Sequence, residues 1–85
     1  MGDVIVTFKV MPTGTDVNLD ELEQKIKELV KPTGVNREPI AFGLVALRVT
    51  KVIPDAGGEL DKVENVMRAL EGVGDVEVVE LTRAL

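Results

Sequence analysis

The chain opens with an alternation of apolar and polar positions. The apolar members are β-branched or aromatic, and one residue separates each from the next: Val4, Val6, Phe8 and Val10. Because the side chains of a strand point alternately to its two faces, this pattern predicts a first strand whose Val and Phe side chains face the core. Pro12 and Gly14 follow and are expected to end the strand in a loop.

The next segment changes to helical spacing. Its apolar residues recur at intervals of three and four, as one face of a helix requires: Leu19, Leu22, Ile26, Leu29 and Val30. Asp16 or Asn18 can cap this predicted helix. Asp20 and Glu21 lie at its positive end, where acidic side chains are favourable. Pro32 prevents its continuation.

A short extended segment, a bend and a long apolar strand come next. Residues 35–41 are predicted to be extended, and Pro39 favours a sheet edge because it has no backbone donor. Gly43 marks a turn or bulge before the longest predicted strand, residues 44–53. One face of that strand carries Val45, Leu47 and Val49, and the other carries Ala46, Arg48 and Thr50. The second face of the sheet is therefore expected to be the less covered one.

A second helix and a last strand complete the pattern. The apolar stripe of this predicted helix is Leu60, Val63, Val66, Met67 and Leu70. Gly72 is expected to end the helix in the left-handed conformation, and residues 73–75 to turn the chain. Val76 and Val78, followed by Leu81, predict the final strand, with residues 82–85 as a short tail.

The order strand, helix, strand, strand, helix, strand predicts an α+β, ferredoxin-like βαββαβ fold. Right-handed crossovers would place both helices on one face of a four-stranded antiparallel sheet. The other face would then be open to solvent or to a partner. With 85 residues we expect one domain, residues 1–85, and one small core. That core must be mainly aliphatic, because the chain has two Phe, no Tyr and no Trp.

Composition excludes several kinds of chemistry. Cysteine and histidine are absent, which removes thiolate nucleophiles, the commonest zinc ligands and the commonest general base. The formal net charge of -5 argues against a nucleic-acid backbone as the main partner, because such binding depends on cationic side chains. No apolar run reaches the roughly 18 residues of a membrane span. The N-terminus lacks a secretory pattern, so we expect a cytoplasmic protein.

Two features allow both a ligand-binding and a structural interpretation. The pair Gly57-Gly58 before a helix could cradle an anion, but Glu59 would repel phosphate, so a flexible connection is favoured. Four clustered carboxylates could bind Mg²⁺ or Ca²⁺: Asp16, Asp20, Glu21 and Glu23. They lack the spacing of a calcium-binding loop, so a solvated helix face is the favoured interpretation. We therefore expect no cofactor or metal bound by this chain.

The fold alone does not define a function. An RNA-recognition domain needs aromatic residues on its central strands, and a copper carrier needs a cysteine pair; this sequence has neither. A small-molecule-binding regulatory module needs no diagnostic residue and stays open, as does a purely structural interaction domain. Phe42 and Gly43 also have two interpretations. The pattern favours Phe42 as a core residue and Gly43 as a bulge, while the alternative is a rigid apolar loop offered to another protein.

Several segments together carry a family resemblance. They are Met1-Gly2-Asp3-Val4, Lys9-Val10-Met11-Pro12, Glu38-Pro39-Ile40-Ala41-Phe42-Gly43-Leu44-Val45-Ala46-Leu47, and Glu71-Gly72-Val73 with Val76-Glu77-Val78. The chain resembles the archaeal elongation factor 1-beta family over its whole length. The resemblance implies a ferredoxin-like guanine-nucleotide exchange factor whose partner is the GTPase elongation factor 1-alpha. Such a factor performs no covalent chemistry and acts on GDP, GTP and Mg²⁺ that its partner holds.

The resemblance also implies where the partner binds. The loop from Pro39 to Gly43 would dock on the GTPase. Arg83 aligns with a Lys near the C-terminus of eukaryotic relatives that is thought to disturb the magnesium and phosphate site. This sequence departs from the family at Arg37, where an aromatic residue is usual, and at Val45 and Ala46, where basic residues are usual. The partner-binding residues expected here are Arg37, Pro39, Ile40, Phe42, Gly43 and Arg83.

Overall fold

Four strands and two helices follow one another in the predicted order. The computed structural model describes residues 2–54 and 58–84. Its elements are β1 (Asp3–Pro12), α1 (Leu19–Val30), β2 (Gly34–Pro39), β3 (Val45–Pro54), α2 (Glu59–Arg68) and β4 (Val73–Ala84). The prediction of a βαββαβ chain is confirmed.

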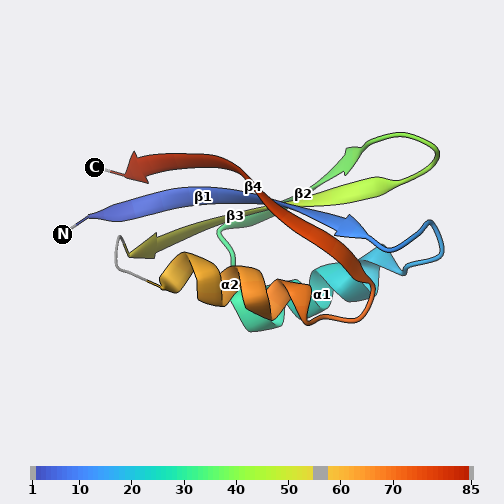
Figure 1. Cartoon of the computed structure of the whole chain (residues 1–85), viewed down its shortest axis with the longest axis horizontal. Helices are drawn as coiled ribbons and strands as arrows, with labels where there is room; N and C mark the ends of the chain where they lie inside the picture. Colours follow the sequence, from blue (N-terminus) through green and yellow to red (C-terminus); the bar gives the residue numbers. More distant parts are fainter. Residues whose placement is uncertain (1, 55–57, 85) are drawn as a thin grey trace.

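The strands form one antiparallel sheet in the order β2-β3-β1-β4. Both helices lie on the same side of it, below the sheet in Figure 1. This arrangement is the ferredoxin-like α+β fold. β2 and β4 are the edge strands, which agrees with the edge position expected from Pro39. No helix in the described ranges has the length and apolar character needed to cross a membrane.

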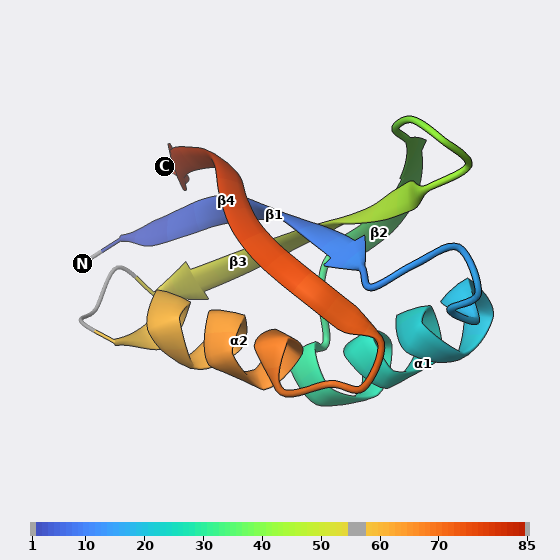
Figure 2. The same ribbon diagram turned by 45° about the vertical axis from the view of Figure 1, so that its right-hand side comes forward.

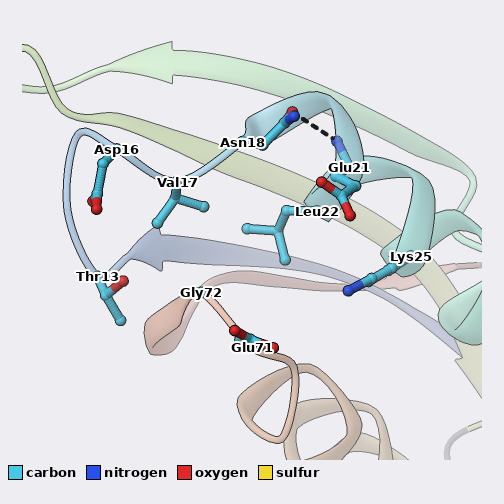
Figure 3. A pocket seen from close by; sticks show the side chains of 9 residues that line it. All are labelled: Thr13, Asp16, Val17, Asn18, Glu21, Leu22, Lys25, Glu71 and Gly72. Carbon is cyan, nitrogen blue, oxygen red and sulfur yellow. Dashed lines mark hydrogen bonds between the residues drawn. The ribbon is translucent and has the colours of Figure 1, made fainter.

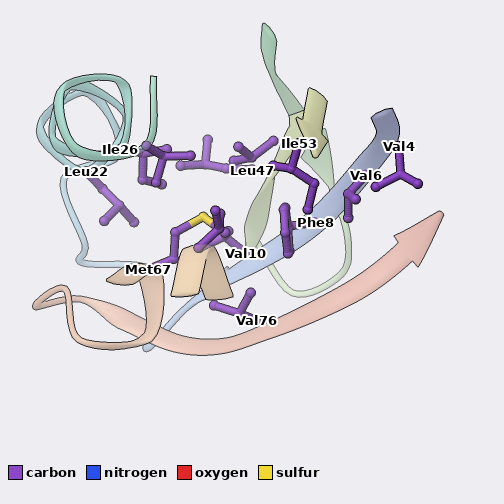
Figure 4. Packing of buried hydrophobic residues seen from close by; sticks show 13 residues of the cluster. Val4, Val6, Phe8, Val10, Leu22, Ile26, Leu47, Ile53, Met67 and Val76 are labelled. Carbon is purple, nitrogen blue, oxygen red and sulfur yellow. The ribbon is translucent and has the colours of Figure 1, made fainter. Parts of the chain in front are cut away.

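The core fills the space between the sheet and the helices (Figure 4). The apolar face of β1 is buried as its alternation predicts, and Phe8 is completely inaccessible. Leu47 and Val49 of β3 and Ile26 of α1 are also completely buried. Met67 is the one thioether in this otherwise mostly aliphatic cluster, and a flexible side chain suits an irregular gap.

The first helix begins and ends for local reasons that the sequence contains. The side chain of Asn18 accepts a hydrogen bond of 3.1 Å from the backbone N–H of Glu21, so Asn18 rather than Asp16 is the cap. Lys31 ends α1 in the left-handed conformation. In each helix, the predicted apolar stripe includes one residue that the structure leaves exposed. Leu29 of α1 is 59% exposed and Val66 of α2 is 39% exposed, because both lie beside the buried face.

The last strand is longer than predicted. Residues 73–75 were expected to turn the chain and residues 82–84 to form a tail, but both belong to β4. Phe8 pairs with Val78 and Thr7 with Glu80, so Val79 is an extra residue in a β-bulge. After the bulge, Leu81 lies opposite Val6 and Arg83 opposite Val4. Directly opposed residues share a face, so Leu81 and Arg83 belong to the helix-bearing side.

Candidate functional site

The connection between β2 and β3 is a tight turn, and we call residues 40–44 the tip. The backbone N–H of Leu44 donates to the carbonyl of Ala41 at 3.0 Å, and that of Ile40 donates to Leu44 at 2.8 Å. Phe42 has a φ of 56° and Gly43 a φ of 79°. Positive φ at both central residues is the requirement of a type I′ hairpin turn. Gly43 therefore serves the turn, as its position in the sequence predicted.

Phe42 is the most exposed large apolar side chain among the described residues, at 96%. The expectation that it belongs to the core was wrong. The core is filled by residues further along β3, such as Leu47. The turn directs Phe42 outward. Ile40 beside it is 40% exposed. The tip thus presents two apolar side chains to solvent.

The conformation of Phe42 is unfavourable in two ways. A residue with a Cβ in the left-handed region costs roughly 1–2 kcal/mol relative to its usual conformations. Type I′ turns favour Asn, Asp or Gly at this position for that reason. An exposed aromatic ring also leaves its apolar surface in water. Because residues with strained backbone conformations cluster at functional sites, the tip is a candidate contact surface.

Arg37, at the base of the tip, is engaged within the chain. Its guanidinium forms ion pairs with Asp20 and with Glu23 of α1, the second at 3.4 Å. The hydrogen bond to the Asp20 carboxylate, with a smaller contribution from Glu23, raises the pKa of Arg37 above its usual value. The hydrogen bond from Lys27, partly opposed by burial, lowers the pKa of Glu23 below its usual 4.5.

Arg83 lies at the opposite end of the sheet from the tip. It lines a small depression of about 170 Å³ together with Val4, Leu60 and Asp61. The tip joins the start of β3, whereas Ile53, which lines the same depression, lies near the end of β3. Eight residue steps separate Val45 from Ile53, so at about 3.3 Å per residue the two regions are roughly 26 Å apart. Figure 2 shows the β2–β3 turn and the end of β4 at opposite ends of the molecule.

A larger depression of about 360 Å³ lies beside the start of α1 (Figure 3). It is bounded by the loop after β1, the first turn of α1 and the α2–β4 turn. Asp16 and Glu21, from the acidic cluster noted in the sequence, lie on its wall, together with Lys25 and Glu71, which sequence reasoning did not single out. In the described parts of the chain, no group of three or more acidic residues is arranged to hold a metal ion.

The Gly57-Gly58 pair is described only in part. Gly57 lies outside the described residues. Gly58 is the N-cap of α2 with a φ of 91°, and no side chain caps the helix by a hydrogen bond there. A glycine suits this left-handed position. Its placement is consistent with the structural interpretation, and the anion-binding alternative has no further support in the described residues around it.

Comparison with known proteins gives a consistent result. Residues 5–84 match the family described as the EF-1 guanine nucleotide exchange domain. A protein of Methanothermobacter thermautotrophicus named elongation factor 1-beta is 43% identical over 90 residues, covering 100% of both chains. Proteins of the same name from Methanospirillum hungatei and Natronomonas pharaonis are each 42% identical, covering 96% and 98% of this chain and 98% and 99% of their own.

Proposed function

Because the chain belongs to the EF-1 guanine nucleotide exchange domain family, we propose that it promotes exchange of GDP for GTP on elongation factor 1-alpha. That GTPase delivers aminoacyl-tRNA, so the exchange factor works in the cytoplasm where translation takes place. The factor makes and breaks no covalent bond. It binds the nucleotide-free GTPase more tightly than the nucleotide-bound form, and by linkage it weakens nucleotide binding by the same factor.

The observation that supports docking at the tip is the exposure of Phe42 in a strained turn. Phe42 and Ile40 supply the apolar surface, while Pro39 and Gly43 shape the backbone that presents it. A buried aromatic side chain at the centre of an interface commonly contributes 2 kcal/mol or more. Burial of Phe42 against the GTPase would contribute binding free energy of this size. In the free protein the ring is exposed to solvent and contributes none.

Arg83 acts at a second place on the GTPase. The roughly 26 Å between the depression near Arg83 and the start of β3 means that one compact ligand cannot contact both regions. A GTPase can contact both regions if its docking surface and its nucleotide site are well separated. The guanidinium of Arg83 would then disturb the Mg²⁺ and phosphate groups, which the GTPase holds. This chain itself binds neither metal nor nucleotide.

Release of labelled GDP from elongation factor 1-alpha tests the proposal. The concentration of exchange factor is varied, so that the half-saturating concentration and the maximal rate are measured separately. Phe42→Ala is expected to raise the half-saturating concentration by about thirtyfold, which corresponds to about 2 kcal/mol. Arg83→Ala is expected to lower the maximal rate. Lys62→Ala removes an exposed cation elsewhere, on α2, and serves as the control.

The outcomes separate the parts of the proposal. Wild-type exchange by Arg83→Ala would refute the role of Arg83 and leave docking at the tip intact. Binding of the GTPase without faster GDP release would indicate a purely structural interaction domain. No effect on any GTPase, together with thermal stabilisation by a small metabolite, would favour the regulatory-module alternative.

A further inference from the structure

The strand that leads to the tip has few means of holding its position. β2 is a six-residue edge strand, so it pairs with β3 on one side only. Pro39 at its end lacks a backbone N–H and adds no donor to the ladder. Strand edges of this kind are among the parts of a protein that open locally at low free energy. Side-chain contacts outside the ladder would therefore help to keep the tip in one orientation and to present Phe42 reliably.

Two neighbouring residues of β2 contact the rest of the molecule on opposite faces of the sheet. Arg37 lies opposite Leu47, whose side chain is in the core, so Arg37 belongs to the helix-bearing side. Glu38 lies opposite Ala46 and belongs to the open side. Glu38 directly precedes Pro39, and Arg37 is one position earlier.

On the helix-bearing side, Arg37 connects β2 to the first turns of α1. Its guanidinium pairs with Asp20, and its Nε lies 3.4 Å from Glu23 Oε1. Glu23 is itself held by Lys27 at 3.1 Å. Two carboxylates on successive turns of the helix therefore receive one guanidinium, whose planar group has donors for both.

On the open side, Glu38 connects β2 to the two central strands. One of its carboxylate oxygens accepts a hydrogen bond of 3.0 Å from Arg48 of β3. The other lies 3.7 Å from the ammonium group of Lys9 on β1. Lys9 and Arg48 are directly opposed in the β1–β3 register, so Glu38 offsets the repulsion between two adjacent cations. The contact with Lys9 reaches past the neighbouring strand β3 to β1.

From this geometry we infer that Arg37 and Glu38 are positioning residues that clamp β2 from both faces and so fix the orientation of the tip. The inference rests on the proposed function for its consequence, which concerns affinity for the GTPase. Exposed ion pairs contribute little to global stability, but they can decide how often a locally mobile edge is in place. If the tip is in its binding-competent orientation only part of the time, the apparent affinity falls by that fraction.

The test compares Arg37→Gln and Glu38→Gln with a matched control, Lys62→Gln, which removes the 3.6 Å ion pair between Lys62 and Glu59 on α2. Amide hydrogen exchange at Ile40 and Leu44, whose backbone N–H groups are hydrogen-bonded within the tip, reports its local opening. Both clamp variants are expected to speed hydrogen exchange at these two amides and to raise the half-saturating concentration for GDP release by about three- to tenfold. The maximal rate is expected to stay within about twofold of wild type, because in the proposed complex the tip docks away from the nucleotide site.

A charge-swapped variant separates positioning from direct contact with the GTPase. It combines Arg37→Glu with Asp20→Arg, and Glu23→Gln avoids a new repulsion at position 23. If Arg37 acts through α1, this variant recovers both the slow hydrogen exchange of the tip and the half-saturating concentration of wild type. Persistent weak binding with a rigid tip would mean that Arg37 contacts the GTPase, and would overturn its positioning role. Unchanged hydrogen exchange at Ile40 and Leu44 in Arg37→Gln and Glu38→Gln would overturn the clamp itself, even if the chain proved to have no nucleotide-exchange activity.

Discussion

Replacing the most exposed aromatic residue in the described chain is expected to make the protein more stable. Phe42→Asn creates the Asn-Gly dipeptide that type I′ turns favour most, at a position where φ is 56°. Asn adopts the left-handed conformation with less strain than other residues that carry a Cβ. Because Phe42 is 96% exposed, almost no packing is lost by removing its ring. The backbone term should therefore dominate the change.

The magnitude follows from the cost of that conformation. Relief of roughly 1 kcal/mol of left-handed strain is expected to appear in the free energy of unfolding. In a domain of this size, 1 kcal/mol corresponds to a rise of about 4–8 °C in Tm. Thermal and urea unfolding of the wild type and Phe42→Asn measure it. The same variant should bind the GTPase more weakly, so stability and exchange would move in opposite directions.

Two alanine variants serve as controls for the interpretation. Phe42→Ala removes the ring but keeps a Cβ in the strained conformation, so its stability should stay close to that of wild type. Phe8→Ala makes the same chemical change at a completely buried site and should cost about 3–5 kcal/mol. Destabilisation by Phe42→Asn, or equal effects of Asn and Ala at this position, would refute the argument that the turn is strained.

Two further predictions concern stability. Gly72→Ala should lower the free energy of unfolding by about 1–2 kcal/mol, because the φ at Gly72 is 95° and an added Cβ would lie 3.1 Å from Val17. Gly34 has open space around it and no positive φ, so Gly34→Ala should show no such loss in the same urea titration. The lowered pKa of Glu23 stabilises the fold above its usual pKa of 4.5, and this contribution is lost as pH falls through the lowered value. Between pH 6 and about pH 3, the free energy of unfolding should therefore decline less steeply for Glu23→Gln than for wild type. Identical slopes would contradict this prediction.

Both the resemblance of the named segments and the match to the family depend on the sequence alone. The segments that carried the resemblance lie within the matched region, residues 5–84, except for the first four residues. Exchange activity itself has no local signature in this chain, because it requires no nucleophile, metal ligand or general base. Physical reasoning from composition could exclude chemistries, whereas the function was recognisable only from the order of residues in the central block.

In the last strand, the sequence pattern alone does not define which face each residue occupies. Val76 and Val78 share one parity in the sequence and Leu81 has the other. That change of parity is the sequence signal of a bulge. Pairing with β1 absorbs Val79 as the extra residue and brings Leu81 and Arg83 to the helix-bearing face. Only the partner strand defines which residue is extra, so the face of Arg83 is a tertiary property.

The tip shows the same division most clearly. The sequence by itself determined the order of the elements, the apolar face of β1, a polar cap at Asp16 or Asn18 and a turn at Gly43, because each depends on spacing or on a single residue's conformational preference. The direction of Phe42 depends instead on a turn closed between two strands, and on a core already filled by Leu47 and its neighbours. Hydrophobicity favoured burial of Phe42. Closure of the hairpin left it in solvent, where it can serve as a contact for another protein.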